Sequence, residues 1–364
     1  MTLIEKLSEP KVFDAFIQEN MKTSTFKSVS KPEMEIEYEP GKAYSAYVAE
    51  YRAAMAGSIV DKNGKKPIHD LPTADQLTGT IARIADKWQM DNEKLDHYFY
   101  LEQRYQSRVK DYTDEQKIAE YKKLVKYLFN PYEVAVIAPW KRTDISYFEG
   151  LFNGYQDVTL DNNSKSGVRY QFDLGIKKFE AKVAAWGQSN ATPVEDIQQV
   201  VDYAESKGKN ILRVRMSRAT FFKMCKAQQF QSQFTLKLGK SNILPASLVP
   251  VEAVNEYLES VQLPKIEIET PKPVLLPNGS SINLIPNDRV VFMFAEKVAV
   301  LKMAESVEKI DKLPNKVYST YDENLVGAWR TEEGRFIDYE MWATPVFVGK
   351  EDYAILKTDS VAQS

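Results

Sequence analysis

No part of this 364-residue chain narrows the choice of fold as much as residues 91–155. Apolar side chains recur there at spacings of three and four, the period that returns side chains to one face of an α-helix. They are Leu95, Phe99, Leu101, Ile118, Tyr121, Leu124, Val125 and Leu128. Pro131 and Pro139 punctuate the run, which resumes over residues 140–155 and has Gly154 near its end. The sequence therefore predicts a long helical segment that is interrupted at the prolines.

Residues 40–90 predict a long, exposed hairpin. Residues 46–60 are rich in small and apolar side chains, and the stretch DKNG at 61–64 follows, in which Asn-Gly favours the positive φ angles of a tight turn. A polar, proline-containing return leads to residues 80–84, which alternate as a strand does. Because an isolated two-stranded hairpin is marginally stable in water, we expect this one to rest on something else.

Residues 1–39 mix charged side chains with isolated apolar positions. Pro10 interrupts a short helix, whose apolar face is formed by Leu3, Leu7, Phe13, Phe16 and Ile17. Such a segment buries little apolar surface by itself. The sequence therefore predicts an N-terminal arm that becomes ordered on a partner.

The clearest single helix begins near Thr192. The stretch TPVE at 192–195 combines a capping box with proline at the first helical position, and Gly208 stands where a C-terminal glycine belongs. A short strand at 211–214 and a second helix, capped by Ser217, follow. This order of helix, strand and helix predicts a compact α/β layer.

The remainder of the chain is rich in β signals. One further helix is predicted over residues 251–261, directly after Pro250. Strands are predicted at 266–268, 274–276, 282–285, 289–294, 298–302, 336–342, 346–348 and 353–357. The chain therefore belongs to the α+β class.

Histidine is nearly absent, which removes much of the catalytic repertoire. His69 lies on the polar return of the hairpin and His97 in the helical run, and neither context provides an orienting partner. Cys225, the only cysteine, lies on a Phe-rich apolar helix where a thiol behaves as a small hydrophobe. The chain has no CxxC, HExxH, calcium-loop or phosphate-loop motif. We therefore expect no catalytic, cofactor-binding or metal-binding residues.

Carboxylates are the one catalytic chemistry that the sequence leaves open. The chain has 51 Asp and Glu residues, and no pattern selects a pair among them. A hydrolase or transferase built on such a pair needs an enclosed pocket, with carboxylates of shifted pKa near residues 195–300.

Residues 206–251 contain nine basic side chains and no acidic one. The basic residues are Lys207, Lys209, Arg213, Arg215, Arg218, Lys223, Lys226, Lys237 and Lys240. Acidic residues are concentrated elsewhere, at Glu33, Glu35, Glu37 and Glu39 and at Glu305, Glu308, Asp311, Asp322, Glu323, Glu332 and Glu333. The basic stretch fits contact with phosphate, contact with an acidic surface of a neighbouring copy, or a solvated face. The formal net charge of −3 slightly favours self-association over nucleic acid.

The hydrophobic fraction of 43% and the charged fraction of 27% are those of an ordinary folded protein. The opening stretch MTLIEKLSEPKVF lacks the apolar core of a signal peptide, and no run approaches the roughly 20 apolar residues of a membrane span. We therefore expect synthesis in the cytoplasm.

Four stretches of the chain carry a family resemblance. They are residues 71–84, the SYFEGLFNGY stretch at 146–155, residues 185–224 with Trp186 ahead of the TPVEDI helix, and residues 317–357 with Tyr339-Glu340 and Ala343-Thr344-Pro345. In character and order they resemble the major capsid proteins of tailed bacteriophages with the Hong Kong 97-type fold, and among these the lambda-type E-protein family. One departure is residues 91–126, which are longer and more helical than this family predicts.

The resemblance implies a domain organisation. We expect an N-terminal arm at 1–39, an extended hairpin loop at 40–90, a spine helix with a peripheral domain at 91–190, an axial domain at 191–316 and a return to the peripheral domain at 317–364.

It also implies a function. The chain would self-assemble into hexamers and pentamers of an icosahedral shell, be located in the virion and enclose DNA without sequence-specific contact. Scaffolding, portal and decoration proteins would be further partners, and no cofactor or membrane is implied. An encapsulin-like cellular nanocompartment is the alternative with the same architecture.

Overall fold

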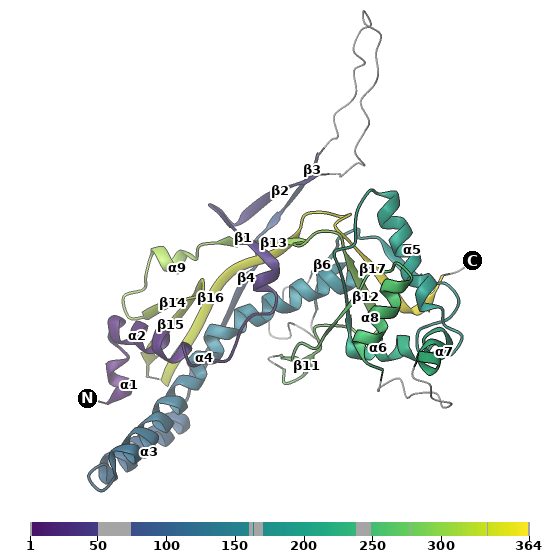
Figure 1. The fold of residues 1–364 in the computed structure, drawn as a ribbon. Coiled ribbons are helices and arrows are strands. Elements are labelled where there is room, and N and C mark those ends of the chain that lie inside the picture. Colours follow the sequence, from purple (N-terminus) through teal and green to yellow (C-terminus); the bar gives the residue numbers. More distant parts are fainter. Residues whose placement is uncertain are drawn as a thin grey trace, which may run out of the picture.

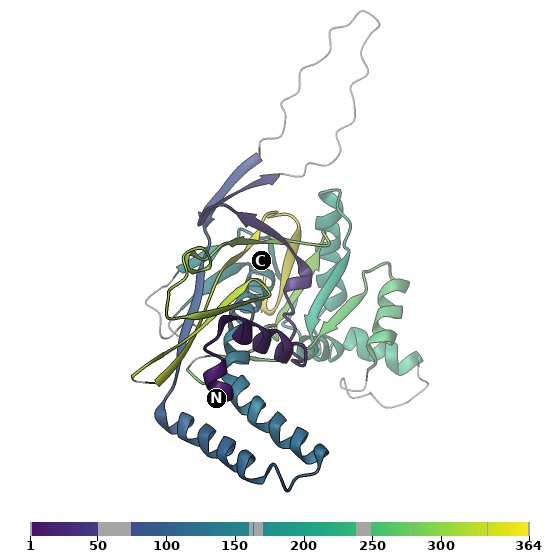
Figure 2. The same cartoon turned by 90° about the vertical axis from the view of Figure 1, so that its left-hand side faces the viewer.

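The computed structural model describes residues 2–49, 74–159, 163, 170–237, 249–276, 278–332 and 334–362. Two β-sheets lie at either side of one long helix, α4 (Asp114–Asn153). The strands β2 (Ala43–Ala49) and β3 (Ala74–Thr80) leave the body at one end, whereas α3 (Asn92–Arg108) and the start of α4 leave it at the opposite end (Figures 1 and 2). The shape is therefore elongated, with a two-stranded ribbon and a helical hairpin as its extremities.

The predicted helical run is confirmed, but its interruption at the prolines is wrong. Helix α4 continues through both Pro131 and Pro139 and ends at Gly154, which adopts a left-handed φ of 69°. Pro139 has no N–H for the carbonyl of Ala135, and the side chain of Asn324 donates to that oxygen instead, at 2.9 Å. A residue far along the chain thus supplies the hydrogen bond that the proline removes.

The N-terminal segment folds on its own chain, which differs from the expectation that a partner orders it. Helices α1 (Leu3–Lys6) and α2 (Pro10–Met21) flank Pro10, which occupies the first position of α2. The ring of Phe13 packs edge-on against Tyr132 of α4, with centroids 5.5 Å apart. Arg335 donates to the carbonyl of Ile4 at 2.9 Å. The apolar face of the segment packs on α4 and the neighbouring sheet. This contact joins residues far apart in sequence, so local patterns do not reveal it.

A five-stranded sheet has strand order β7-β17-β12-β8-β9. Its strands are β7 (Lys178–Ala181), β17 (Tyr353–Val361), β12 (Arg289–Met293), β8 (Arg213–Ser217) and β9 (Ile266–Glu269). Alternate side chains face two different cores, because successive side chains of a strand point to opposite faces. Val291 and Met293 pack with the C-terminal part of α4, whereas Val290 and Phe292 pack with the covering helices. Both faces of this sheet are therefore buried.

The covering helices are α5 (Pro193–Ser206), α6 (Arg218–Cys225), α7 (Gln228–Lys237) and α8 (Val251–Ser260). The Ser217 cap of α6 is confirmed, since its hydroxyl accepts from the N–H of Thr220 at 3.1 Å. Pro193 begins α5 as predicted, but Thr192 makes no capping hydrogen bond, and its backbone (φ −118°, ψ 63°) lies outside the extended geometry that a capping residue adopts. Gly208 has the predicted positive φ, at 66°.

A six-stranded sheet forms the other half of the body, in the order β1-β13-β16-β15-β14 with β4 also paired to β16. Its strands are β1 (Met34–Glu39), β13 (Ala299–Ala304), β16 (Gly334–Phe347), β15 (Asn324–Thr331), β14 (Val317–Tyr321) and β4 (Arg83–Met90). One face packs on α2 and α4 through Val326, Ala328, Ile337 and Tyr339. The opposite face carries charged and aromatic side chains.

The remaining elements are short. They are η1 (Lys31–Glu33), α9 (Val307–Ile310) and the strand pairs β5 (Tyr155–Val158) with β6 (Tyr170–Asp173) and β10 (Val274–Leu275) with β11 (Ser281–Ile282). The turn at 61–64 and His69 lie outside the described residues.

Sheet pairing departs from the predicted boundaries in two places. Residues 299–304, expected in the axial domain, form β13 of the six-stranded sheet, and residues 353–361, expected in the returning segment, form β17 of the five-stranded sheet. The strands predicted at 336–342 and 346–348 are one strand, β16, which runs through Pro345. Strand partners far apart in sequence decide these boundaries, so local patterns do not mark them.

Candidate functional site

The ribbon of β2 and β3 starts from a polar cluster, which we call the ribbon root and define as Lys42, Arg83, Ser306, Glu340 and Trp342. The carboxylate of Glu340 accepts from Arg83 at 2.6 Å, from the Ser306 hydroxyl at 2.8 Å and from Trp342 Nε1 at 2.6 Å. The ammonium of Lys42 lies 4.1 Å from the centre of the Trp342 ring, within range of a cation–π interaction. Residues on both legs of the ribbon thus meet one strand, β16.

Glu340 is ionised at neutral pH. Burial raises its pKa, but the hydrogen bonds from Trp342, Ser306 and Arg83 stabilise the carboxylate more, so that the pKa lies below its ordinary value. The cluster is therefore held by charge-assisted hydrogen bonds, the stronger kind.

Backbone contacts reinforce the ribbon root. The N–H of Ile81 donates to the carbonyl of Lys42 at 2.8 Å, which closes the ribbon at its base. The N–H of Ala82 donates to the Thr344 hydroxyl at 2.7 Å, and the N–H of Ala343 donates to the carbonyl of Ala82 at 3.1 Å. The point at which the ribbon leaves the six-stranded sheet is therefore well defined.

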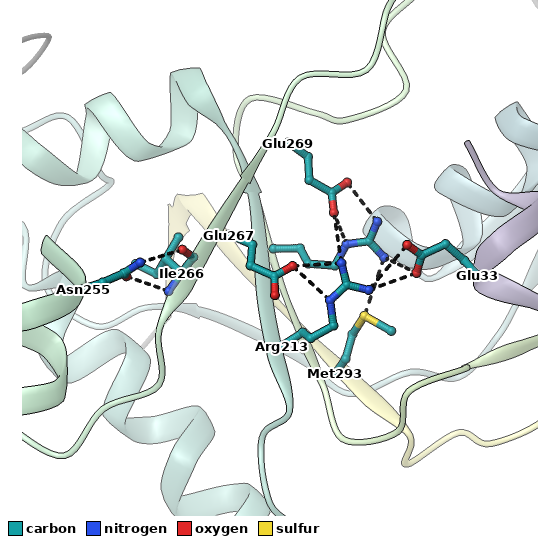
Figure 3. A network of polar contacts seen from close by, with 8 residues as sticks. Glu33, Arg213, Asn255, Ile266, Glu267, Glu269 and Met293 are labelled. Carbon is teal, nitrogen blue, oxygen red and sulfur yellow. Dashed lines mark hydrogen bonds and ion pairs between the residues drawn. The ribbon is translucent and has the colours of Figure 1, made fainter. Parts of the chain in front are cut away.

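A second polar cluster joins the N-terminal segment to the five-stranded sheet (Figure 3). Glu33 lies 3.2 Å from both Arg213 and Arg215 of β8. Arg213 also pairs with Glu267 at 2.8 Å, and Arg215 forms a two-pronged pair with Glu269 of β9. We call these five residues the arm contact. It connects η1 directly to β8 and β9.

Arg215 is the centre of the arm contact, with a side chain that is only 1% exposed. Burial alone lowers the pKa of its guanidinium, but the hydrogen bond and charge of Glu269 and the charge of Glu33 outweigh it and raise the pKa. The guanidinium also lies 5.9 Å from the Phe148 ring of α4. A charge this deeply buried requires both carboxylates.

The structure divides the basic stretch in two. Four of its side chains pair within the chain: Arg213 and Arg215 in the arm contact, Lys207 with Glu351 at 2.6 Å and Lys209 with Asp352 at 3.3 Å. Arg218, Lys223 and Lys226 form no ion pair with any described residue. Lys240 and the side chain of Lys237 lie outside the described part.

The acidic residues near the N-terminus are likewise paired within the chain. Glu33 belongs to the arm contact, and Glu37 and Glu39 both pair with Lys302, whose side chain is nearly buried. Glu33, Glu37 and Glu39 therefore have cation partners within their own chain and need none on a neighbouring copy.

The residues first considered for nucleophilic catalysis do not come together. His97 is exposed, with its ring 5.1 Å from that of Tyr127. Cys225 is fully buried, and burial raises the pKa of its thiol to about 12. Among the described residues no group of His, Cys, Asp and Glu has the arrangement of a metal site, and no helix is long and apolar enough to cross a bilayer.

The carboxylate alternative gains no support from the described residues. Burial raises the pKa of both Asp196 and Asp288, but Asp196 is used to hold the chain, accepting from the N–H of Lys182 at 2.7 Å and from Trp186 Nε1 at 2.8 Å. Two hollows of the described surface lie away from these carboxylates. One, of about 350 Å³, lies on the charged face of the six-stranded sheet, and the other, of about 560 Å³, lies beside α3.

Sequence reasoning did not identify the ribbon root or the arm contact. Glu340 and Trp342 carry no local motif, and Arg215 was recognised only as part of a basic run. The one available signal was the coincidence of a basic run with an acidic N-terminal segment, which does join at Glu33.

No family model matches the sequence, and no curated protein matches it. Among solved structures, the chain is similar to a protein assigned as the capsid protein of a prophage of Escherichia coli CFT073, with a TM-score of 0.56 and 13% identity over 97% of this chain and 99% of that chain. It is also similar to a phage-related protein of Bordetella bronchiseptica (TM-score 0.46, 8% identity, 97% and 98% covered). A third similar structure is the capsid subunit of cyanophage A-1(L), with a TM-score of 0.46 and 10% identity over 93% of this chain and 94% of that chain.

The first of these similarities shows the fold. The α+β, Hong Kong 97-type capsid fold expected from the sequence is confirmed over nearly the whole chain. The relation to the lambda-type E-protein family stays a prediction.

Proposed function

We propose that this chain is the major capsid protein of a tailed phage, a structural protein that assembles with copies of itself into the icosahedral shell around the DNA. The observation that carries the proposal is the β2–β3 ribbon, which projects from a body of capsid-type fold (Figure 1). A two-stranded ribbon is marginal in water by itself, so a neighbouring molecule is its natural support.

The rest of the molecule is suited to hold such a ribbon. Both legs continue into strands of the six-stranded sheet, and α4 packs against both sheets. A subunit of this kind is a rigid body with an extended connector. Repetition of one contact between identical rigid bodies generates closed, symmetric assemblies.

The finer parts of the proposal rest on the resemblance. They are membership of the lambda-type E-protein family, scaffolding, portal and decoration proteins as partners, DNA as unspecific cargo, and location in the virion. An encapsulin-like nanocompartment would use the same subunit architecture around a protein cargo.

The experiment is negative-stain electron microscopy of the chain, expressed alone and together with its neighbouring genes. We expect closed shells, or hexamers and pentamers. A variant in which a short Gly-Ser turn replaces residues 46–77 should fold, as judged by circular dichroism, and fail to form shells. Small, uniform particles from the unaltered chain under both conditions would refute the proposal. Shells that enclose a specific protein instead of DNA would favour the nanocompartment.

A further inference from the structure

The charged side chains on the outer face of helix α5 are all acidic. Glu195, Asp202 and Glu205 are exposed, and the helix contains no Lys or Arg. Glu195 accepts from the amide of Gln229, and Asp202 from that of Gln198, both neutral donors that leave the negative charge in place. No described cation pairs with any of the three carboxylates.

Helix α6 presents a basic outer face. Arg218 and Lys226 are exposed and Lys223 is half-buried, and these are the members of the basic stretch that have no described ion-pair partner. At 1.5 Å per residue, the acidic set extends for about 15 Å and the basic set for about 12 Å. The two faces therefore match in charge number and in length.

The two helices cover opposite halves of one sheet face. Helix α5 packs on β7 and β17, and α6 packs on β8 and β9, while β7 and β9 are the two edges of the five-stranded sheet. Figure 1 shows α5 at the upper end and α6 at the lower end of this helical layer. The acidic and basic faces therefore belong to different sides of the same layer.

We propose that the acidic face of α5 in one copy binds the basic face of α6 in the next, as a head-to-tail contact. This inference rests on the proposed self-assembly and names the surface that mediates part of it. A head-to-tail contact uses two different patches of each copy, and repetition of it closes a ring when the rotation fits. Opposite charges across such a contact select the orientation and speed the encounter of copies.

A second copy explains both faces, whereas DNA explains only the basic one. A layer that carries three cations on one side and three carboxylates on the other has little net attraction for a polyanion. A neighbouring subunit with the same two faces neutralises both sets at once.

The test uses charge reversal in the full chain. One variant carries Asp202→Lys and Glu205→Lys, a second carries Arg218→Glu and Lys226→Glu, and a third carries all four substitutions. Glu195 and Lys223 stay unchanged, because Glu195 holds Gln229 and the charge of Lys223 acts on Asp288. The four-residue variant has the original net charge and serves as the matched control.

Assembly is followed by light scattering and analytical ultracentrifugation, and folding by circular dichroism and thermal midpoint. We expect each two-residue variant to assemble at least about tenfold more slowly than the unaltered chain at low salt, and the four-residue variant to recover. A 1:1 mixture of the two-residue variants should associate, because each supplies the face that the other lacks.

Three outcomes with the variants would overturn the contact. Two-residue variants that fold and assemble at the original rate would refute the contact without refuting the capsid function. A four-residue variant that assembles as slowly as the two-residue variants would also refute the contact. Variants that form normal shells but retain less DNA would refute it too. If the unaltered chain forms no shells, the capsid function fails, and ultracentrifugation at low salt then decides the contact. Small oligomers that disappear on charge reversal support it, and a monomer refutes it.

Discussion

The two sheets of this molecule differ in how many of their faces are buried. The five-stranded sheet is covered on both faces, by helices and by α4, and the one charged side chain that its strands bury fully is that of Arg215. The six-stranded sheet is covered on one face only, and its other face is closed by ion pairs such as Lys316 with Asp338 and Glu308. The first is buried on both faces and tolerates one buried charge because two carboxylates, Glu33 and Glu269, pair with it. The second sheet has one solvated face, and the ribbon extends from its strands.

The largest effect is expected from removing Arg215, the buried charge of the five-stranded sheet. Arg215→Ala should lower the free energy of unfolding by about 3–5 kcal/mol, because the partly buried carboxylates of Glu33 and Glu269 lose the buried one of their two guanidinium partners. Arg213→Ala, at a side chain that is about a third exposed, should cost at most about 1 kcal/mol. Urea unfolding of both variants checks the difference. Equal losses would mean that burial does not decide the strength of the arm contact.

A smaller effect concerns the junction of the six-stranded sheet with α4. Asn324→Ala should cost about 1–3 kcal/mol, because the carbonyl of Ala135 loses its donor in a buried place. Pro139→Ala restores the helical N–H at that position, so the cost of Asn324→Ala should shrink in the Pro139→Ala background. Unfolding free energies of the four proteins form the cycle. Strictly additive losses would refute the pairing of Asn324 with the proline.

A smaller effect still separates the two sheets by pH. The pKa of Glu340 is lowered from 4.5 in the folded state, so its stabilisation is present above that value and is lost as the pH falls through the folded pKa. The pKa of Asp196 is raised from 3.8, so its contribution is greatest below that value and is lost as the pH rises through the folded pKa.

Acidification should therefore weaken β16 and not α5. Hydrogen exchange of peptides from the two elements, corrected for the intrinsic rate, measures this. Glu340→Gln should make β16 less sensitive to acid. Parallel loss of protection in both elements, unchanged by the substitution, would contradict the assignment.

The smallest effect tests the exposed face of the six-stranded sheet. The Lys87 ammonium lies 4.2 Å from the centre of the Phe336 ring and 5.0 Å from that of Trp329. Lys87→Ala should cost about 0.5–1 kcal/mol, whereas Lys87→Arg, which keeps the cation, should cost less. Thermal midpoints are sufficient for this comparison. A loss as large as that of Arg215→Ala would show that this face is not solvated.

Local signals in the sequence were enough for many elements. Pro250 before α8, Ser217 before α6 and Gly154 after α4 each act within a few residues of themselves, and each is found where expected. The hairpin was predictable for the same reason, and β2 and β3 do pair, but the strand predicted at 80–84 is wrong, because β3 ends at Thr80 and β4 begins at Arg83.

Distant contacts decided the rest. Pro139 does not end its helix because Asn324 supplies a donor from another element. Residues 353–361 join the five-stranded sheet because β12 and β7 accept them as a neighbour. The ribbon root and the arm contact consist of side chains that are far apart in sequence, so no spacing rule finds them. Only the charge balance of the chain pointed to the arm contact.

The position of the ribbon root has a mechanical consequence. Glu39, at the end of β1, pairs with Ala304, which pairs with Trp342, and Arg83, at the start of β4, pairs with that same Trp342. The ribbon therefore behaves as a cantilever with one clamped end. A force applied to β2 and β3 reaches the sheet through both legs at a single point and spreads into two strands that run onward in opposite directions from it. Such a beam bends along its length before its clamp gives way, so its two strands set its stiffness, whereas the contacts at Trp342 set the direction in which it leaves the sheet.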